Sequence, residues 1–237
     1  MLYVVPTPIG NLDDITIRAK KVFDKSKFVL CEDGRITSKL FRLLGITNQP
    51  TFINLVKNNQ FNTSGIQFAL TSNLGNQPIV DNLESDNIVI ALVSDAGTPA
   101  VSDPGYEVIR MVQELELQYT VLPGATAFVP ALVASGMAGS SFEFIGFLPL
   151  KKGRQSAWQD IKLRLENNRQ PIILYESVHR ITKFIQESQQ FLSPTTRIWI
   201  GQELTKSHET YYQAIIATID PSRITQKGEF VIVLQGY

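Results

Sequence analysis

Short apolar runs alternate along the chain with segments in which apolar residues recur three or four positions apart. Such runs are typical of buried strands, and the spacing of three or four is typical of helices that bury one face. The predicted strands are residues 2–5, 28–31, 88–94, 119–122, 142–146, 171–175, 197–203 and 230–235. Because helix-like segments separate most of them, we expect crossover connections and a largely parallel sheet covered on both faces.

Two predicted helices have recognisable starting points. Residues 106–117 carry one apolar stripe, made of Val108, Ile109, Val112 and Leu115. Asp103 and Pro104 precede this stripe, and an acceptor side chain followed by proline predicts a helix that begins there. The second helix contains Ile181, Phe184 and Ile185, and Ser177 is its predicted N-cap.

The second half of the chain has a different pattern. Residues 211–219 and 227–237 resemble strands joined by the loop at 220–222, which predicts a hairpin and an antiparallel component. Pro123 and Gly124 end a predicted strand, and we place a domain boundary there, which gives α/β domains at 1–122 and 123–237. The stretch 58–82 is rich in Asn, Gln, Ser and Thr and is predicted to be exposed.

Composition narrows the classes of protein. The 237 residues include 22 Lys and Arg and 22 Asp and Glu, so bulk electrostatic binding of nucleic acid is disfavoured, while a local basic patch is allowed. No apolar run approaches the roughly 20 residues of a membrane helix, and the amino terminus lacks the basic region of a signal peptide. A single cysteine, Cys31, favours a reducing cytoplasmic location. His179 and His208 lack partners at metal-ligand spacing, so no metal is expected.

Loops that contain acids, glycine and proline follow several predicted strands. The first two are residues 6–16 and 94–105. In open α/β sheets, ligands bind at the carboxyl ends of the strands. The first loop has neither the glycine spacing of a dinucleotide site nor that of a nucleoside-triphosphate site. Together the loops predict a composite ligand site along one edge of the sheet.

Two charged segments leave alternatives open. After the second strand, Glu32 and Asp33 stand beside Arg35, where the carboxylates are candidates for a general base and Asp33 is equally a candidate helix cap. A basic loop after the strand at 142–146 suits a phosphate backbone, or is simply solvated. Its cations are Lys151, Lys152 and Arg154.

The motifs at residues 2–12, 14–16, 94–99 and 103–105 resemble those of the ribosomal RNA small subunit methyltransferase I family, a branch of the tetrapyrrole methylase superfamily. Segments at 122–124, 146–149, 175–180, 203–206 and 227–229 match later motifs of that family in order. The resemblance implies two α/β domains, with a largely parallel sheet in the first, a mixed sheet in the second and a cofactor cleft between them. It also implies a homodimer.

The resemblance further implies methyl transfer from S-adenosylmethionine to the ribose 2′-hydroxyl of a cytidine in the decoding region of 16S rRNA. The implied cofactor contacts are Ile9, Asp95, Thr98, Thr126, Ala127, Tyr175 and Leu204. The basic loop matches a basic family loop, so Lys151, Lys152 and Arg154 are implied contacts for RNA phosphate. Glu32, Asp33 and Arg35 are the candidate catalytic residues.

The chain departs from the family pattern on its implied substrate side. Gly34 and Ile36 stand where the family usually has threonine and histidine, and residues 55–60 replace a stretch that usually holds two histidines and a glutamate. Two other functions therefore stay open. One is methylation of a tetrapyrrole-like small molecule, and the other is a ribosome-associated protein that binds the cofactor without catalysis.

Overall fold

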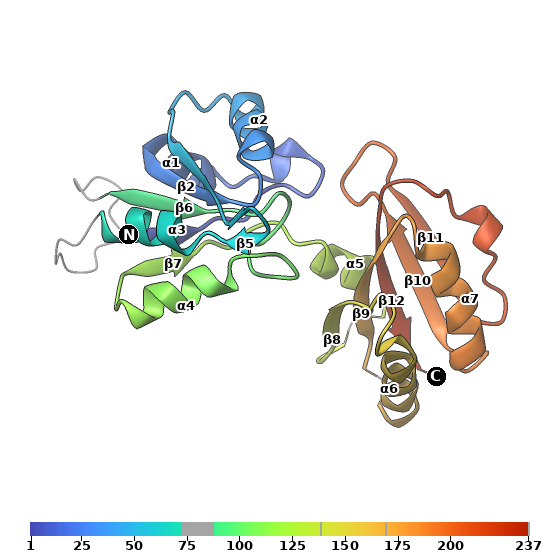
Figure 1. The fold of residues 1–237 in the computed structure, drawn as a ribbon. Coiled ribbons are helices and arrows are strands. Elements are labelled where there is room, and N and C mark those ends of the chain that lie inside the picture. Colours follow the sequence, from blue (N-terminus) through green and yellow to red (C-terminus); the bar gives the residue numbers. More distant parts are fainter. Residues whose placement is uncertain (73–87, 138, 169, 237) are drawn as a thin grey trace. The chain divides into compact units, whose positions relative to one another are not determined.

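The computed structural model describes residues 1–72, 88–137, 139–168 and 170–236. The chain forms two compact units, Met1–Thr126 and Ala127–Tyr237, each with its own sheet (Figure 1). Among the described helices, none combines the length and the apolar character needed to cross a membrane.

The first unit is built on a five-stranded parallel sheet of order β3-β2-β6-β1-β7. Its strands are β1 (Leu2–Val4), β2 (Ser26–Cys31), β3 (Thr51–Asn54), β6 (Val89–Leu92) and β7 (Tyr119–Val121). Side chains alternate between the two faces of a strand, and the central strands β1, β2 and β6 bury residues on both faces. The predicted parallel sheet with two covered faces is confirmed.

Helices cover both faces of this sheet (Figure 1). One face packs against α1 (Ile17–Lys25) and α2 (Gly34–Leu44), and the other packs against α3 (Thr63–Thr71) and α4 (Tyr106–Glu114). Side chains that accept hydrogen bonds cap three of the four helices. Thr16 caps α1, Asp33 caps α2 and Asn62 caps α3.

Two expectations for this unit are wrong. The helix after the 94–105 loop begins at Tyr106, and its N-cap residue is Gly105, which has φ 134° and no capping side chain. Asp103 and Pro104 therefore belong to the loop. In the polar stretch 58–82, α3 buries Ile66 and Leu70 in the core, because aliphatic side chains recur there at helical spacing. Residues 73–82 of that stretch lie outside the described residues.

A short hairpin follows β3. Its strands are β4 (Val56–Lys57) and β5 (Gln60–Phe61), which pair antiparallel. Asn58 and Asn59 form the two-residue turn, and both have positive φ, 53° and 59°. Asparagine tolerates this left-handed region, which tight hairpins require at both turn positions.

The second unit has a mixed sheet of order β11-β10-β12-β9-β8. Its strands are β8 (Glu143–Phe147), β9 (Ile172–Ser177), β10 (Arg197–Gln202), β11 (Thr210–Ile215) and β12 (Glu229–Gln235). The β8–β9 pair is parallel, and the other pairs are antiparallel. The mixed sheet is confirmed, but the predicted hairpin is wrong, because β10 lies between β11 and β12 and pairs with both.

Helices α6 (Arg154–Asn167) and α7 (Ile181–Phe191) share one core with one face of this sheet. Helix α5 (Phe128–Ala134) is associated with the other face, where the Phe128 ring stacks on Phe144 at 4.7 Å between centroids. The expected cap of α7 is wrong. Ser177 is the last residue of β9, and Arg180 occupies the N-cap position without a capping side-chain bond.

Candidate functional site

Loops from neighbouring strands join at the carboxyl edge of the first sheet. The loop after β1 and the loop after β6 form a two-residue antiparallel bridge, in which the Thr7 N–H donates to the Gly97 carbonyl at 2.9 Å and the Gly97 N–H donates to the Thr7 carbonyl at 3.0 Å. The buried Thr7 hydroxyl also donates to the Ser94 carbonyl at 3.2 Å. Two loops that are distant in sequence thus form one rigid wall.

The loop after β7 joins the same wall. The Thr98 hydroxyl donates to the Ala125 carbonyl at 2.9 Å. Gly97 has φ 82°, and a Cβ there would lie 3.3 Å from the Ile9 Cγ2 atom. The structure therefore brings together the predicted residues Ile9 and Thr98, with Asp95 two residues before Gly97. Thr126 ends this unit and Ala127 begins the next one, so these two predicted residues are consecutive at the division.

Asp95 carries an unpartnered acceptor. Its Oδ1 atom is buried and has no hydrogen-bond partner among the described residues. Burial raises the pKa of this carboxyl, and the Asp33 carboxylate adds to the rise, against a lowering hydrogen bond from the Asp33 main chain. A buried carboxylate oxygen without a donor is costly. The atom is suited to a ligand that brings a cationic or N–H donor.

Glu32, which directly follows the neighbouring strand β2, is hydrogen-bonded to this wall. Its Oε1 accepts a hydrogen bond from the Asp95 N–H at 3.1 Å. Burial raises the pKa of Glu32, the Asp95 N–H lowers it, and the nearby Asp95 carboxylate raises it further. A carboxylate whose pKa is raised toward neutrality is a better proton acceptor than an ordinary one.

Asp33 and Arg35 are already engaged with each other. The Asp33 carboxylate accepts from the Arg35 N–H at 2.8 Å and from the guanidinium Nε at 3.0 Å. Hydrogen bonds from the Arg35 side chain and main chain lower the pKa of Asp33 to about 2. So strongly acidic a carboxyl is a poor proton acceptor, and the helix-cap interpretation of Asp33 is confirmed.

The sequence predicts no role for two residues that hold this edge together. One is Thr7, whose main chain and hydroxyl bind the loop after β6. The other is Asn54 at the end of β3, whose Oδ1 accepts from the Gly34 N–H at 2.9 Å and ties β3 to the start of α2. An amide at the end of a short apolar run was the available signal, but β3 itself was not predicted. The sequence TFIN has only two apolar residues, which is too short a run to predict a strand, and all four residues of β3 are partly buried or exposed.

The second unit has an edge where its predicted residues gather. Strand β12 runs antiparallel to both β9 and β10, and β8 is parallel to β9, so β8, β9 and β10 all end at one edge. Tyr175 lies near the end of β9, with its ring 4.9 Å from Phe144 and 5.6 Å from Phe147. Leu204 follows β10 and is buried against Gly201, where a Cβ would lie 2.8 Å from Leu204 Cδ2.

The basic loop of the same edge divides into an exposed and a buried part. Lys151 and Lys152 are exposed. Arg154 is only 4% exposed, and its guanidinium pairs with Glu187 at 2.7 Å. The expectation that Arg154 contacts RNA phosphate is therefore not compatible with the structure, because its donors point into the unit.

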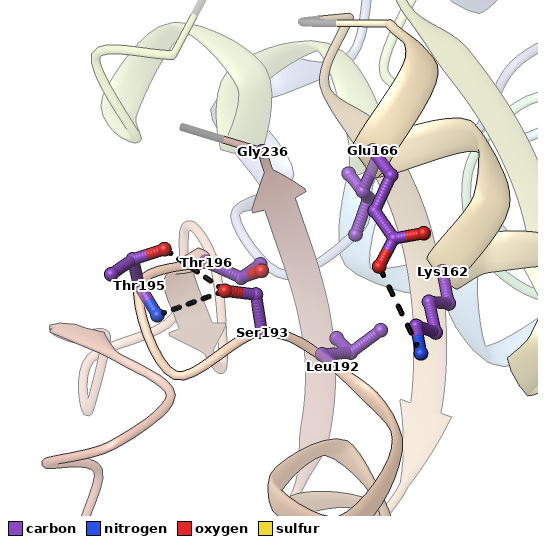
Figure 2. A pocket seen from close by; sticks show the side chains of 8 residues that line it. Lys162, Glu166, Leu192, Ser193, Thr195, Thr196 and Gly236 are labelled. Carbon is purple, nitrogen blue, oxygen red and sulfur yellow. Dashed lines mark hydrogen bonds and ion pairs between the residues drawn. The ribbon is translucent and has the colours of Figure 1, made fainter.

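A cavity of about 240 Å³ lies at the opposite edge of the second sheet (Figure 2). It is lined by the carboxyl-terminal half of α6, by the segment before β10 and by Gly236. Lys162 and Glu166 form an ion pair of 3.8 Å at this cavity, and the Ser193 and Thr195 hydroxyls lie 3.0 Å apart. The predicted site residues lie elsewhere. Within the described part of the chain, no group of three or more His, Cys, Asp or Glu is arranged to hold a metal ion.

Comparisons with known proteins agree with this architecture. The family described as Tetrapyrrole (Corrin/Porphyrin) Methylases matches residues 1–220. A ribosomal RNA small subunit methyltransferase I from Vibrio cholerae is 37% identical, and the match covers 100% of this chain and 77% of that protein. A protein of the same name from Hydrogenobaculum is 37% identical, with 98% and 94% covered.

Solved structures show the same fold at low sequence identity. The crystal structure of the methyltransferase CobJ superposes with a TM-score of 0.67 at 14% identity and covers 99% of this chain and 93% of that one. Uroporphyrin-III C-methyltransferase from Thermus thermophilus, complexed with S-adenosyl homocysteine, superposes with a TM-score of 0.60 at 15% identity, with 98% and 96% covered.

Proposed function

The chain belongs to the tetrapyrrole methylase family and, within it, to the family of ribosomal RNA small subunit methyltransferase I. From this premise we propose that it methylates the ribose 2′-hydroxyl of a cytidine in the decoding region of 16S rRNA, with S-adenosylmethionine as the methyl donor. The single observation that carries the cofactor assignment is the buried, unpartnered Oδ1 of Asp95 in a wall built from three strand-end loops.

The residues present fit this cofactor. An α-ammonium group would supply the donor that Asp95 Oδ1 lacks, and a charged hydrogen bond of this kind is strong. Ile9 offers an apolar surface beside Gly97, and the loop holding Thr98 is fixed to Ala125. When bound, S-adenosylmethionine supplies an electrophilic methyl group on a sulfonium. We assign Ile9, Asp95, Thr98, Thr126 and Ala127 to its binding, and Tyr175 and Leu204 from the second unit.

We assign the proton of the ribose hydroxyl to Glu32. A hydroxyl is a weak nucleophile, and a positioned acceptor assists by taking its proton as attack proceeds. Glu32 is oriented by the Asp95 N–H, and burial raises its pKa, whereas the pKa of Asp33 is lowered to about 2. Asp33 and Arg35 then act by holding the start of α2, next to Glu32.

The remaining assignments concern partners. We propose that Lys151 and Lys152 contact phosphates of 16S rRNA in the small ribosomal subunit, since both are exposed cations. We also propose that the protein is cytoplasmic, acts as a homodimer and uses no metal.

The decisive experiment is methyl transfer to small ribosomal subunits that lack the modification. The protein is incubated with these subunits and labelled S-adenosylmethionine, and ribose methylation is mapped on 16S rRNA. We expect one new 2′-O-methylcytidine in the decoding region. Labelled tetrapyrrole without labelled rRNA would identify a small-molecule methyltransferase. Cofactor binding by calorimetry without any transfer would identify a non-catalytic protein.

The same assay tests the assignment of Glu32. Glu32→Gln keeps the shape and an acceptor oxygen but removes the basic carboxylate, and loss of a general base slows transfer by about 100-fold or more. Glu107→Gln, an exposed change in the first turn of α4, is the matched control and should transfer at the wild-type rate. Full activity of Glu32→Gln with unchanged cofactor affinity would contradict the assignment.

A further inference from the structure

Two arginines of the second unit hold adjacent carbonyl groups at the base of the basic loop. Arg180 Nη1 donates to the Leu148 carbonyl at 3.2 Å, and Arg154 Nη1 donates to the Pro149 carbonyl at 3.0 Å. Arg180 directly precedes α7 and Arg154 begins α6, so the two donors approach from different elements. The Arg154 N–H also donates to the Lys151 carbonyl at 3.2 Å.

Two carboxylates hold these arginines in turn. The side chain of Glu176 is fully buried, with Oε1 2.7 Å from Arg180 Nε and Oε2 3.6 Å from Arg154 Nη2. Glu187 accepts from Arg154 Nε at 2.8 Å and from the Trp158 indole N–H at 3.0 Å. Lys183 approaches Glu187 from the outside at 3.7 Å. Together these side chains form an arginine–glutamate network, made of Arg154, Arg180, Glu176 and Glu187.

The basic loop is buried at its base, where the network binds it, and exposed at the residues that follow. Leu148 is 4% exposed and belongs to the core, whereas Leu150 is 71% exposed and Lys151 and Lys152 are exposed with it. Buried ion pairs contribute little net stability compared with apolar packing, because desolvation offsets their attraction. Their fixed geometry, in contrast, determines where the bound carbonyls lie.

We propose that the arginine–glutamate network is a positioning device for substrate binding, which holds the loop so that Lys151 and Lys152 meet rRNA phosphates. This inference rests on the proposed function. Its positioning residues are Arg154, Arg180, Glu176 and Glu187, and none of them contacts the RNA. The network also places the Arg180 guanidinium 5.7 Å from the centre of the Phe147 ring, at the start of the same loop.

Charge and positioning predict opposite effects for one substitution. Glu176→Gln removes a negative charge close to the basic loop, so simple electrostatics predicts tighter binding of RNA. If the network positions the lysines, the same change weakens the ion pair that holds Arg180, loosens the loop and weakens binding. Glu166→Gln on α6 changes the net charge equally but lies at the opposite edge of the sheet, so it is the matched control.

The experiment measures the affinity of the intact protein for unmethylated small ribosomal subunits at several potassium chloride concentrations and constant magnesium. We expect Glu176→Gln to weaken binding about tenfold and to flatten the salt dependence, as the double variant Lys151→Ala/Lys152→Ala does through the loss of about two phosphate contacts. Glu166→Gln should stay within about twofold of the wild type, since surface substitutions usually have small effects.

Combining the changes identifies the route of the effect. In the Lys151→Ala/Lys152→Ala background, Glu176→Gln should add less than about a twofold loss, because coupled residues are not additive. Cofactor binding, measured by calorimetry, should stay unchanged in every variant. If Glu176→Gln does not fold, Glu187→Gln replaces it, because Glu187 is partly exposed and also holds Arg154.

Each outcome decides the proposal. Binding by Glu176→Gln as tight as that by Glu166→Gln overturns it, and so does a loss that is just as large when both lysines are absent. A wild-type protein that binds no small subunits overturns the proposed function together with this inference. Wild-type binding with unaffected Glu176→Gln and Glu187→Gln overturns the positioning role alone.

Discussion

Burial gives Asp95 and Glu32 their chemical character. Both carboxyls have raised pKa values with desolvation as the largest cause, and Asp95 Oδ1 lacks a donor. The charged forms are therefore disfavoured in the folded protein without ligand, so these groups reduce stability as the pH rises through and above their ordinary values. Residues that serve binding are often kept at such a cost to stability.

Replacing Asp95 separates these two roles. Asp95→Asn removes the penalised charge, so the ligand-free protein should melt at the same temperature or higher. The variant should bind S-adenosylmethionine at least about tenfold more weakly, since a hydrogen bond to a charged group contributes about 1.5–3 kcal/mol. Calorimetry and thermal melting provide the measurements, with the exposed Asp24→Asn in α1 as control. Unchanged cofactor affinity of Asp95→Asn would refute the proposed contact.

Cys31 offers a second test of burial in the first unit. The thiol is fully buried, and desolvation raises its pKa to about 11 from 9.0. When folding raises the pKa of an acid, the protein loses stability as the pH rises above the pKa that the acid has in the unfolded chain. Through Cys31, the free energy of unfolding should therefore fall between about pH 9 and pH 11. At pH 8 we expect the thiol of the folded protein to resist a thiol reagent and to react once urea unfolds the unit. Rapid labelling without denaturant would contradict this burial.

Close contacts between loops, rather than helices or strands, build the edge of the first sheet. The loop after β7 passes so close to the loop after β1 that a Cβ at Gly124 would lie 2.6 Å from the Pro6 Cβ. A proline ring has little freedom to move away. Glycine at position 124 is therefore required by packing between two loops.

Gly124→Ala should force these loops apart. We expect a loss of about 1–3 kcal/mol in the free energy of unfolding, as for other overpacked sites, together with weaker cofactor binding. Gly139→Ala is the matched control, because a Cβ there would have one neighbour, 4.0 Å away. Urea unfolding and calorimetry measure the two effects. A Gly124→Ala protein as stable as Gly139→Ala would show that the loops are free to separate.

The local sequence predicted which segments form helices and strands better than it predicted which strands pair with each other. The apolar periodicity of 106–117 locates α4. The helix ends at Glu114, before the end of the predicted range, because Glu116 adopts the left-handed region at φ 51°. Residues 211–219 contain β11 as expected, but its partner is β10 rather than β12. A strand pattern reports which face is buried and contains no information about which strand lies next to it.

Each unit has its own hydrophobic core and its own residues by which its unfolding can be followed. Both tryptophans, Trp158 and Trp199, belong to the second unit, and the single cysteine belongs to the first. The residues of the three buried clusters are likewise confined to one unit each. Tryptophan fluorescence and labelling of Cys31 therefore report on different parts of the molecule.

Truncating one core should affect the two probes unequally. Ile185 is fully buried in the second unit, and Ile185→Ala creates a cavity that costs about 2–5 kcal/mol. We expect the fluorescence transition in urea to move to lower concentration by more than the transition of Cys31 labelling. The exposed Leu163→Ala on α6 should move neither. Equal shifts of both transitions after Ile185→Ala would show that the units unfold together.

Periodicity, caps and the order of motifs were sufficient to predict the α/β class, nearly all strands of the two sheets and the family, because these depend on residues close in sequence. Strand order, the burial of Arg154 and the missing donor at Asp95 were decided by tertiary structure. Arg154 and Lys152 differ little as letters in a basic loop, yet one is enclosed by Glu176 and Glu187 and the other is exposed. Solvent access depends on contacts between distant segments, and these exist only once the chain has folded.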